Sequence, residues 1–138
     1  MNRLTVTAKF HVVRGQRSRK ELRPGDAPAR DVPARLPRVA KLMALAIRFE
    51  GLVRDGVVAD YAELARLGHV TRARMSQITS LLLLAPEIQE ALLFLPRMSS
   101  GKDAITERDL RPIAATPDWR KQRALWADVV ASDKRRND

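Results

Sequence analysis

One stretch, residues 60–84, limits the folds open to this chain more than any other. Two short segments with the 3.6-residue period of amphipathic helices are separated there by a break at residues 68–70, Gly-His-Val. Asp60 precedes the first segment, where Glu63 completes a capping box, and Thr71 precedes the second. A short helix, a tight glycine-containing turn and a second helix form the pattern of a helix-turn-helix. The second helix of such a motif normally lies in the DNA major groove.

On a helical wheel, the second helix separates into a buried side and a small, uncharged outer stripe. Met75, Ile78, Thr79 and Leu82 should face the first helix. Small outer residues allow close approach to base edges, where glutamine pairs with adenine and arginine with guanine. The free N–H groups at the helix start suit a phosphate, and the sequence does not decide whether the arginines reach bases or phosphates. The candidate DNA-binding residues are Thr71, Arg72, Ala73, Arg74, Ser76, Gln77 and Ser80.

Positive charge is concentrated in front of this motif. The chain has a net charge of +10; residues 1–41 hold 11 Lys or Arg against 3 Asp or Glu, whereas residues 42–99 hold 6 of each. Four of the eight prolines lie in residues 14–38, which show no sustained period and are expected to form an extended arm. Such an arm suits a polyanionic partner, although a solvated linker has the same composition. Its candidate phosphate contacts are Arg14, Arg17, Arg19, Lys20 and Arg23.

The rest of the chain predicts one strand and several helices. Residues 4–13 alternate polar and apolar side chains as a strand does, but no second strand of equal quality is evident. Helical periods cover residues 37–54 and begin again at Pro86, Thr106 and Thr116. We therefore expect a mainly α fold: a helical bundle that contains a helix-turn-helix, with a short N-terminal β-strand and a basic arm. Three regions are predicted: strand and arm in 1–36, helical DNA-binding domain in 37–131, and flexible tail in 132–138.

The motif also resembles a known family. The run LARLGHVTRARMSQITSLLLLAPEIQEALLFLP resembles the helix-turn-helix domain of the ParB/KorB partition proteins, which follow their recognition helix with a leucine-rich segment and a Pro-Glu-initiated helix. The clear resemblance covers about residues 58–95. It implies sequence-directed binding of double-stranded DNA, in transcription regulation or as an accessory to partition or recombination of a mobile element. In KorB-like members, residues after the recognition helix also affect specificity; the candidates are Arg108, Arg111, Arg120, Lys121 and Arg123.

The resemblance has a limit. Full partition proteins carry a nucleotide-binding domain before the helix-turn-helix, whereas this chain has no Gly-rich phosphate loop. We therefore expect a small stand-alone relative that binds no nucleotide.

Little in the sequence favours catalysis or a cofactor. There are no cysteines and two histidines, His11 and His69, without the spacing of a metal site. We expect no enzymatic activity, no metal and no cofactor. The longest apolar run is far shorter than a bilayer span, so a cytoplasmic, nucleoid-associated protein without a membrane contact is expected.

Two other classes of function remain open. A basic RNA- or ribosome-associated protein would use the arm as its main site and the helices as scaffold. An adaptor would bind a recombinase or partition protein through its strand and leucine-rich helices. A homodimer is expected in the DNA-binding class, because one chain reads about half of a typical palindromic site.

Overall fold

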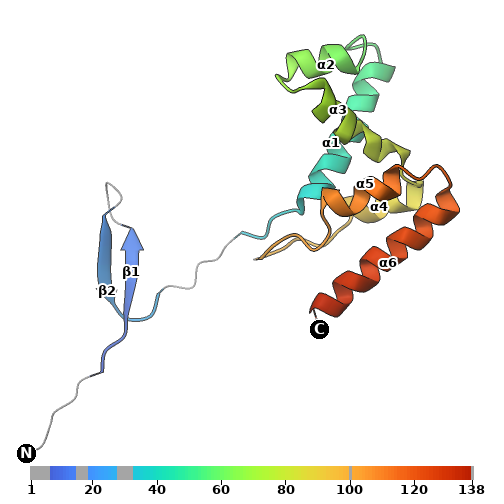
Figure 1. The fold of residues 1–138 in the computed structure, drawn as a ribbon. Helices are drawn as coiled ribbons and strands as arrows, with labels where there is room; N and C mark the ends of the chain where they lie inside the picture. Colours follow the sequence, from blue (N-terminus) through green and yellow to red (C-terminus); the bar gives the residue numbers. More distant parts are fainter. Residues whose placement is uncertain (1–6, 15–18, 28–32, 100, 138) are drawn as a thin grey trace, which may run out of the picture. The chain divides into compact units, whose positions relative to one another are not determined.

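The computed structural model describes residues 7–14, 19–27, 33–99 and 101–137. They belong to two compact units, Met1–Val32 and Pro33–Asp138. The protein is mainly α: the first unit holds a pair of strands and the second is helical (Figure 1). Arg35 and Met98 exchange two backbone hydrogen bonds of 2.8 Å, which fasten the chain ahead of the first helix to a later loop.

The first unit is an antiparallel hairpin. Strand β1 (Phe10–Arg14) pairs with β2 (Lys20–Pro24), and Val12 lies opposite Leu22. The expected strand is thus found at its C-terminal end; residues 1–6 lie outside the described part. Its partner was predicted to be extended arm, and that prediction is wrong for Lys20–Pro24. Lys, Glu and Pro have low strand propensity, so the pairing depends on backbone hydrogen bonds that the pattern of side chains does not reveal.

The helical unit is built around one core. Its elements are α1 (Arg38–Arg54), α2 (Tyr61–Leu67), α3 (Arg72–Thr79), the 3₁₀ helix η2 (Ser80–Leu83), α4 (Pro86–Leu93), α5 (Glu107–Ala114) and α6 (Trp119–Asn137). The bounds of α1 and the start of α5 agree with the helical periods in the sequence. Figure 1 shows α2 and α3 at one end of the unit and α6 at the other. The largest fully buried core side chains come from α1, α4, α5 and the end of η2: Val39, Met43, Leu84, Ile88, Leu92, Leu110 and Ile113.

Helix α1 is capped from a distance. Pro37 stands at its N-cap and offers no side-chain acceptor. Asp103 supplies one instead: its Oδ2 accepts a 2.9 Å hydrogen bond from the backbone N–H of Arg38, and its Oδ1 accepts a 2.6 Å bond from Arg35. The carboxylate therefore satisfies one of the free N–H groups that every helix start leaves. It also ties the loop before α5 to the beginning of α1.

A buried glutamine fastens α6 to the middle of the unit. Gln122 is 1% exposed. Its Oε1 accepts a 2.7 Å bond from the backbone N–H of Ala85, and its Nε2 donates to the carbonyl oxygens of Leu83 (3.1 Å) and Thr116 (2.8 Å). The groups of Leu83 and Ala85 lie where η2 ends and α4 begins, so the amide replaces hydrogen bonds that the break between these helices leaves unmade. Thr116 lies just before α6, so the same amide also binds the turn that precedes its own helix.

The end of α6 differs from expectation in secondary structure. Residues 132–138 were predicted to be a flexible tail, but α6 continues through Asn137. Lys134, Arg135 and Arg136 lie in its last turn, where positive charge complements the helix dipole.

Candidate nucleic-acid interface

Helix α2 begins at a side-chain cap. The Oδ1 of Asp60 accepts a 2.8 Å bond from the N–H of Glu63, as the sequence predicts. The carboxylate of Glu63 returns to the N–H of Ala59, at 2.6 Å, rather than to that of Asp60. The reciprocal bond of the predicted capping box is therefore displaced by one residue, and the start of α2 is still held from both sides.

The turn between α2 and α3 is closed by two backbone bonds. The N–H of His69 donates to Arg66 (3.3 Å) and that of Val70 to Ala65 (3.0 Å), which is the pairing of a Schellman helix end. Such an end needs a left-handed residue, and here it is His69, with a φ of 54°, rather than the usual glycine. Gly68 has a φ of −84°, and a Cβ there would lie 3.3 Å from the carbonyl oxygen of Leu64, which is a tight contact.

Helix α3 starts and packs as the sequence predicts. The hydroxyl oxygen of Thr71 accepts a 3.1 Å bond from the N–H of Arg74 and so caps the helix. Met75 and Ile78 are buried, and α3 packs against both α1 and α2. The outer stripe is open to solvent: Thr71, Arg72, Ala73, Ser76 and Gln77 are all exposed.

The helical wheel holds only for two turns of α3. After Thr79 the chain tightens into η2, with three residues per turn instead of 3.6. Leu81 and Leu84 are consequently the buried leucines, and Leu82, expected to be buried, is only partly so. Ser80 is half-buried at the edge of the stripe, and its hydroxyl donates a 2.7 Å bond to the carbonyl oxygen of Gln77. Because its proton is already engaged, this hydroxyl has only its oxygen left, as an acceptor, for a further hydrogen bond.

Arg74 differs from the other predicted contacts, because its guanidinium is engaged within the helical unit. Its Nη1 lies 2.6 Å from Oε1 of Glu107 on α5 and 3.1 Å from Oε1 of Gln77. The side chains of Arg74 and Glu107 are 28% and 15% exposed. Sequence reasoning treated Arg74 as a free cation and missed Glu107, since an acidic residue in a first helical turn is explained locally by the helix dipole.

Arg72 is the basic residue best placed beside the stripe. Two hollows flank α2 and α3, and Arg72 lines both. The smaller, of about 180 Å³, also contains Tyr61 and Ser76; the larger, of about 610 Å³, also contains Arg66. Arg72 forms no ion pair within the described residues, whereas Arg66 lies 3.8 Å from Glu63. An unpaired guanidinium at the start of a capped helix can meet a phosphate or a base edge.

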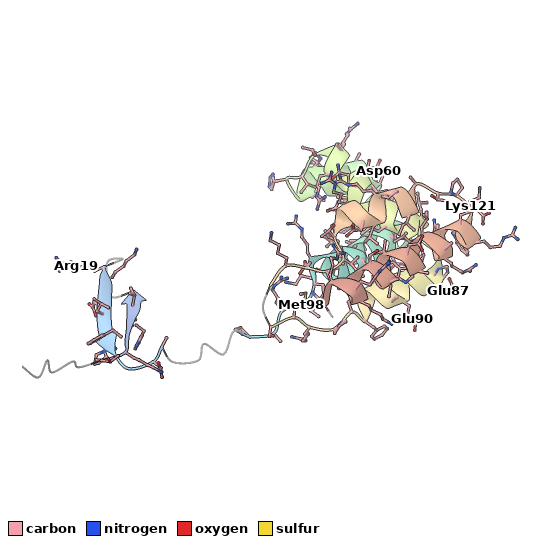
Figure 2. The ribbon with its side chains drawn as sticks, turned by 60° about the horizontal axis from the view of Figure 1, so that its bottom comes forward. Arg19, Asp60, Glu87, Glu90, Met98 and Lys121 are labelled. Carbon is pink, nitrogen blue, oxygen red and sulfur yellow. The ribbon has the colours of Figure 1, made fainter. Side chains whose placement is uncertain are left out.

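The predicted phosphate contacts of the arm now lie partly on the hairpin. Arg19 directly precedes β2 (Figure 2), and Lys20 and Arg23 belong to it. Arg23 lies 3.7 Å from Glu21, with both side chains more than half exposed, so its charge remains accessible. Arg14 ends β1 opposite Lys20, although its side chain is not among those described, and Arg17 lies outside the described residues.

The basic residues after the recognition helix are distributed over α5 and α6. Arg111 approaches Glu107 at 3.7 Å, Arg120 approaches Asp118 at 3.9 Å, and Arg123 binds Glu87 of α4 at 2.9 Å. Glu87 and Lys121 are labelled in Figure 2. The pKa of Glu87 is lowered, first by a hydrogen bond from its own backbone N–H at the start of α4 and then by Arg123. Of these arginines, Arg111 shares a carboxylate with Arg74 and is thus linked to α3.

Other site chemistry is sparse in the described ranges. Residues 7–14, 19–27, 33–99 and 101–137 bring together no group of three or more His, Asp or Glu that could hold a metal ion. In the same ranges, no helix combines the length and apolarity needed to cross a membrane.

No protein-family model, curated protein or solved structure matches this chain. The resemblance to the ParB/KorB family therefore remains a prediction from the residues of the motif.

Proposed function

We propose that the protein binds double-stranded DNA with sequence preference, using α3 as the recognition helix of a helix-turn-helix. The observation that carries the proposal is the exposed stripe of Ala73, Ser76 and Gln77 on a helix that is capped by Thr71 and closed against α2 by a Schellman turn. Small side chains allow the helix to enter the major groove, and Gln77 offers the donor and acceptor that adenine requires.

Charge supports the same proposal. Arg72 lies beside the stripe without an ion pair to any described residue, and the hairpin adds the exposed cations Arg19, Lys20 and Arg23. Because phosphate neutralisation supplies most of the non-specific affinity for DNA, the hairpin would contribute binding strength while α3 contributes base preference. The process we propose is transcription regulation, or an accessory role in partition or recombination of a mobile element.

Selection from a randomised duplex pool tests the proposal. The full chain is expected to enrich a defined sequence at physiological salt, and a palindromic site would indicate a dimer. Gln77→Ala should lose about 1–3 kcal/mol of binding free energy at one base pair and relax the preference there. Arg72→Ala should weaken binding to every duplex and reduce the salt slope by about 1.

Lys134→Ala is the matched control, because it removes an exposed charge at the C-terminal end of α6, away from α2 and α3 (Figure 1). It should leave both affinity and preference unchanged. Binding of structured RNA in preference to any duplex, or no affinity for DNA at physiological salt, would contradict the proposal.

A further inference from the structure

Three polar side chains link α5 to the outer stripe of α3. Glu107 holds Nη1 of Arg74 at 2.6 Å, and the same nitrogen donates to Oε1 of Gln77 at 3.1 Å. Arg74 and Gln77 are three positions apart on one helix and therefore share a face. Glu107 comes from 33 positions further along the chain.

From this geometry we infer that Glu107 is a positioning residue for base recognition: it fixes Arg74, and Arg74 fixes the orientation of the Gln77 amide. The inference rests on the proposed function, since it names what sets the base preference of the same helix. Glu107 would touch no DNA itself.

The ion pair has the properties of a rigid support. Both side chains are more than two-thirds buried, so solvent screens their attraction less than it would at the surface. Hydrogen bonds between charged partners are shorter and stronger than neutral ones. Arg111 lies 3.7 Å from the same carboxylate oxygen, so a second positive charge lies beside Glu107.

The orientation of the amide decides what it can recognise. With Oε1 turned toward the guanidinium, Gln77 keeps one oxygen lone pair and both N–H groups for the groove. Adenine offers an N–H₂ donor and an N7 acceptor, which match that arrangement, whereas guanine offers two acceptors. To donate to guanine at the position where adenine offers its N–H₂ group, the amide would have to exchange the positions of its oxygen and its NH₂ group. The NH₂ group would then face the guanidinium of Arg74, and two hydrogen-bond donors would oppose each other.

Loss of the carboxylate should therefore alter preference in a particular direction. Without Glu107, the amide of Gln77 rotates freely and Arg74 is released toward the groove. Arginine binds guanine O6 and N7, so both changes reduce the discrimination of adenine from guanine. A side chain held in its bound conformation also loses less entropy on binding, so the free Gln77 should bind its own base more weakly.

The test compares two duplexes that carry the site selected by the full-length wild-type chain, with adenine or guanine at the base pair that depends on Gln77. Glu107→Gln is expected to lower the adenine-to-guanine affinity ratio on the order of tenfold. Arg74→Met, which removes the guanidinium and keeps the alkyl stem, should lower the same ratio if the first variant folds poorly. Partial unfolding reduces both affinities together and leaves the ratio unchanged.

Glu90→Gln is the matched control, because it makes the same substitution at an exposed carboxylate on α4 and leaves the link from Glu107 through Arg74 to Gln77 in place. Its ratio should equal that of the wild type. In the Gln77→Ala background, Glu107→Gln should lower the ratio by less than it does alone, because only the release of Arg74 remains to act. An unchanged ratio in Glu107→Gln and Arg74→Met would overturn this inference alone, provided that the wild type selects a site; a wild type that selects none would overturn the proposed function as well.

Discussion

Asp103 caps a helix that begins 65 positions earlier in the chain. Its bond from the backbone N–H of Arg38 is the main cause that holds the pKa of this carboxyl below its ordinary value of 3.8, and the guanidinium of Arg35 adds to the effect. Since the pKa is lower in the folded protein than in the unfolded chain, ionised Asp103 stabilises the fold above about pH 4. That stabilisation disappears as the pH falls through the folded pKa.

Asp103→Asn should accordingly lower the free energy of unfolding by about 1–2 kcal/mol at pH 7, as the loss of a helix cap does. The difference from the wild type should shrink as the pH falls below about 4, because first the unfolded chain and then the folded protein takes up a proton on this carboxyl. Urea unfolding at pH 7 and pH 3 measures both values. Asp55→Asn is a suitable control, because Asp55 forms only a surface contact of 3.5 Å with Arg54. An equal difference at the two pH values would contradict the role of the charge.

His69 shows how a single residue permits the turn of the motif. Its φ of 54° lies in the left-handed region, which histidine tolerates better than most residues. His69→Gly should raise the free energy of unfolding by about 1 kcal/mol or less, because relief of backbone strain exceeds the added entropy of the unfolded chain. His69→Val should lower it by about 1–2 kcal/mol. Thermal unfolding of the two variants checks the order; a valine variant as stable as the wild type would show that the turn is not strained.

At the scale of elements, the transition from α3 to η2 decides which leucines form the core. The side chain of Gln89 donates to the carbonyl oxygens of Leu82 (3.0 Å) and Leu84 (2.9 Å), so the end of the 3₁₀ helix is held by α4. Leu84 is 0% exposed and Leu83 is 62% exposed, although the two are adjacent in a run of four leucines.

The run offers a matched pair of substitutions. Leu84→Ala should lower the free energy of unfolding by about 2–5 kcal/mol, because it opens a cavity in the core. Leu83→Ala should change it by less than about 0.5 kcal/mol. Chemical denaturation of both variants is the measurement. Equal losses would mean that η2 continues as an α-helix and that the predicted wheel extends beyond Thr79.

At the scale of the whole molecule, the proposed function assigns base preference to the helical unit and phosphate contacts to the hairpin. Substituting Arg19, Lys20 and Arg23 together with glutamine should reduce the slope of log affinity against log salt by about 0.9 for each lost phosphate contact. Sequence preference should remain, because α3 is untouched. Binding titrations between low and physiological salt give the slope.

The control is a second triple variant with the same change in net charge. It replaces Lys134, Arg135 and Arg136 with glutamine. If both triple variants lose the same slope, the hairpin acts only through net charge and is not a phosphate contact.

The sequence by itself determined the features that depend on a few neighbouring residues. Helical periods predicted α1 and α5, Thr71 and Asp60 predicted the starts of α3 and α2, and the break at residues 68–70 predicted the turn. Each is governed by backbone propensity or by a cap within one helical turn, so the information is local.

Only the tertiary structure decided the features that join distant parts of the chain. Examples are the cap of α1 by Asp103, the buried amide of Gln122 between η2 and α4, and the pair of Arg74 with Glu107. In each case a polar group is held because helix packing brings its partner within hydrogen-bond distance and removes competing water. No local pattern encodes that proximity. The sequence therefore predicts a free cation at Arg74, whereas in the folded protein this side chain joins α3 to α5.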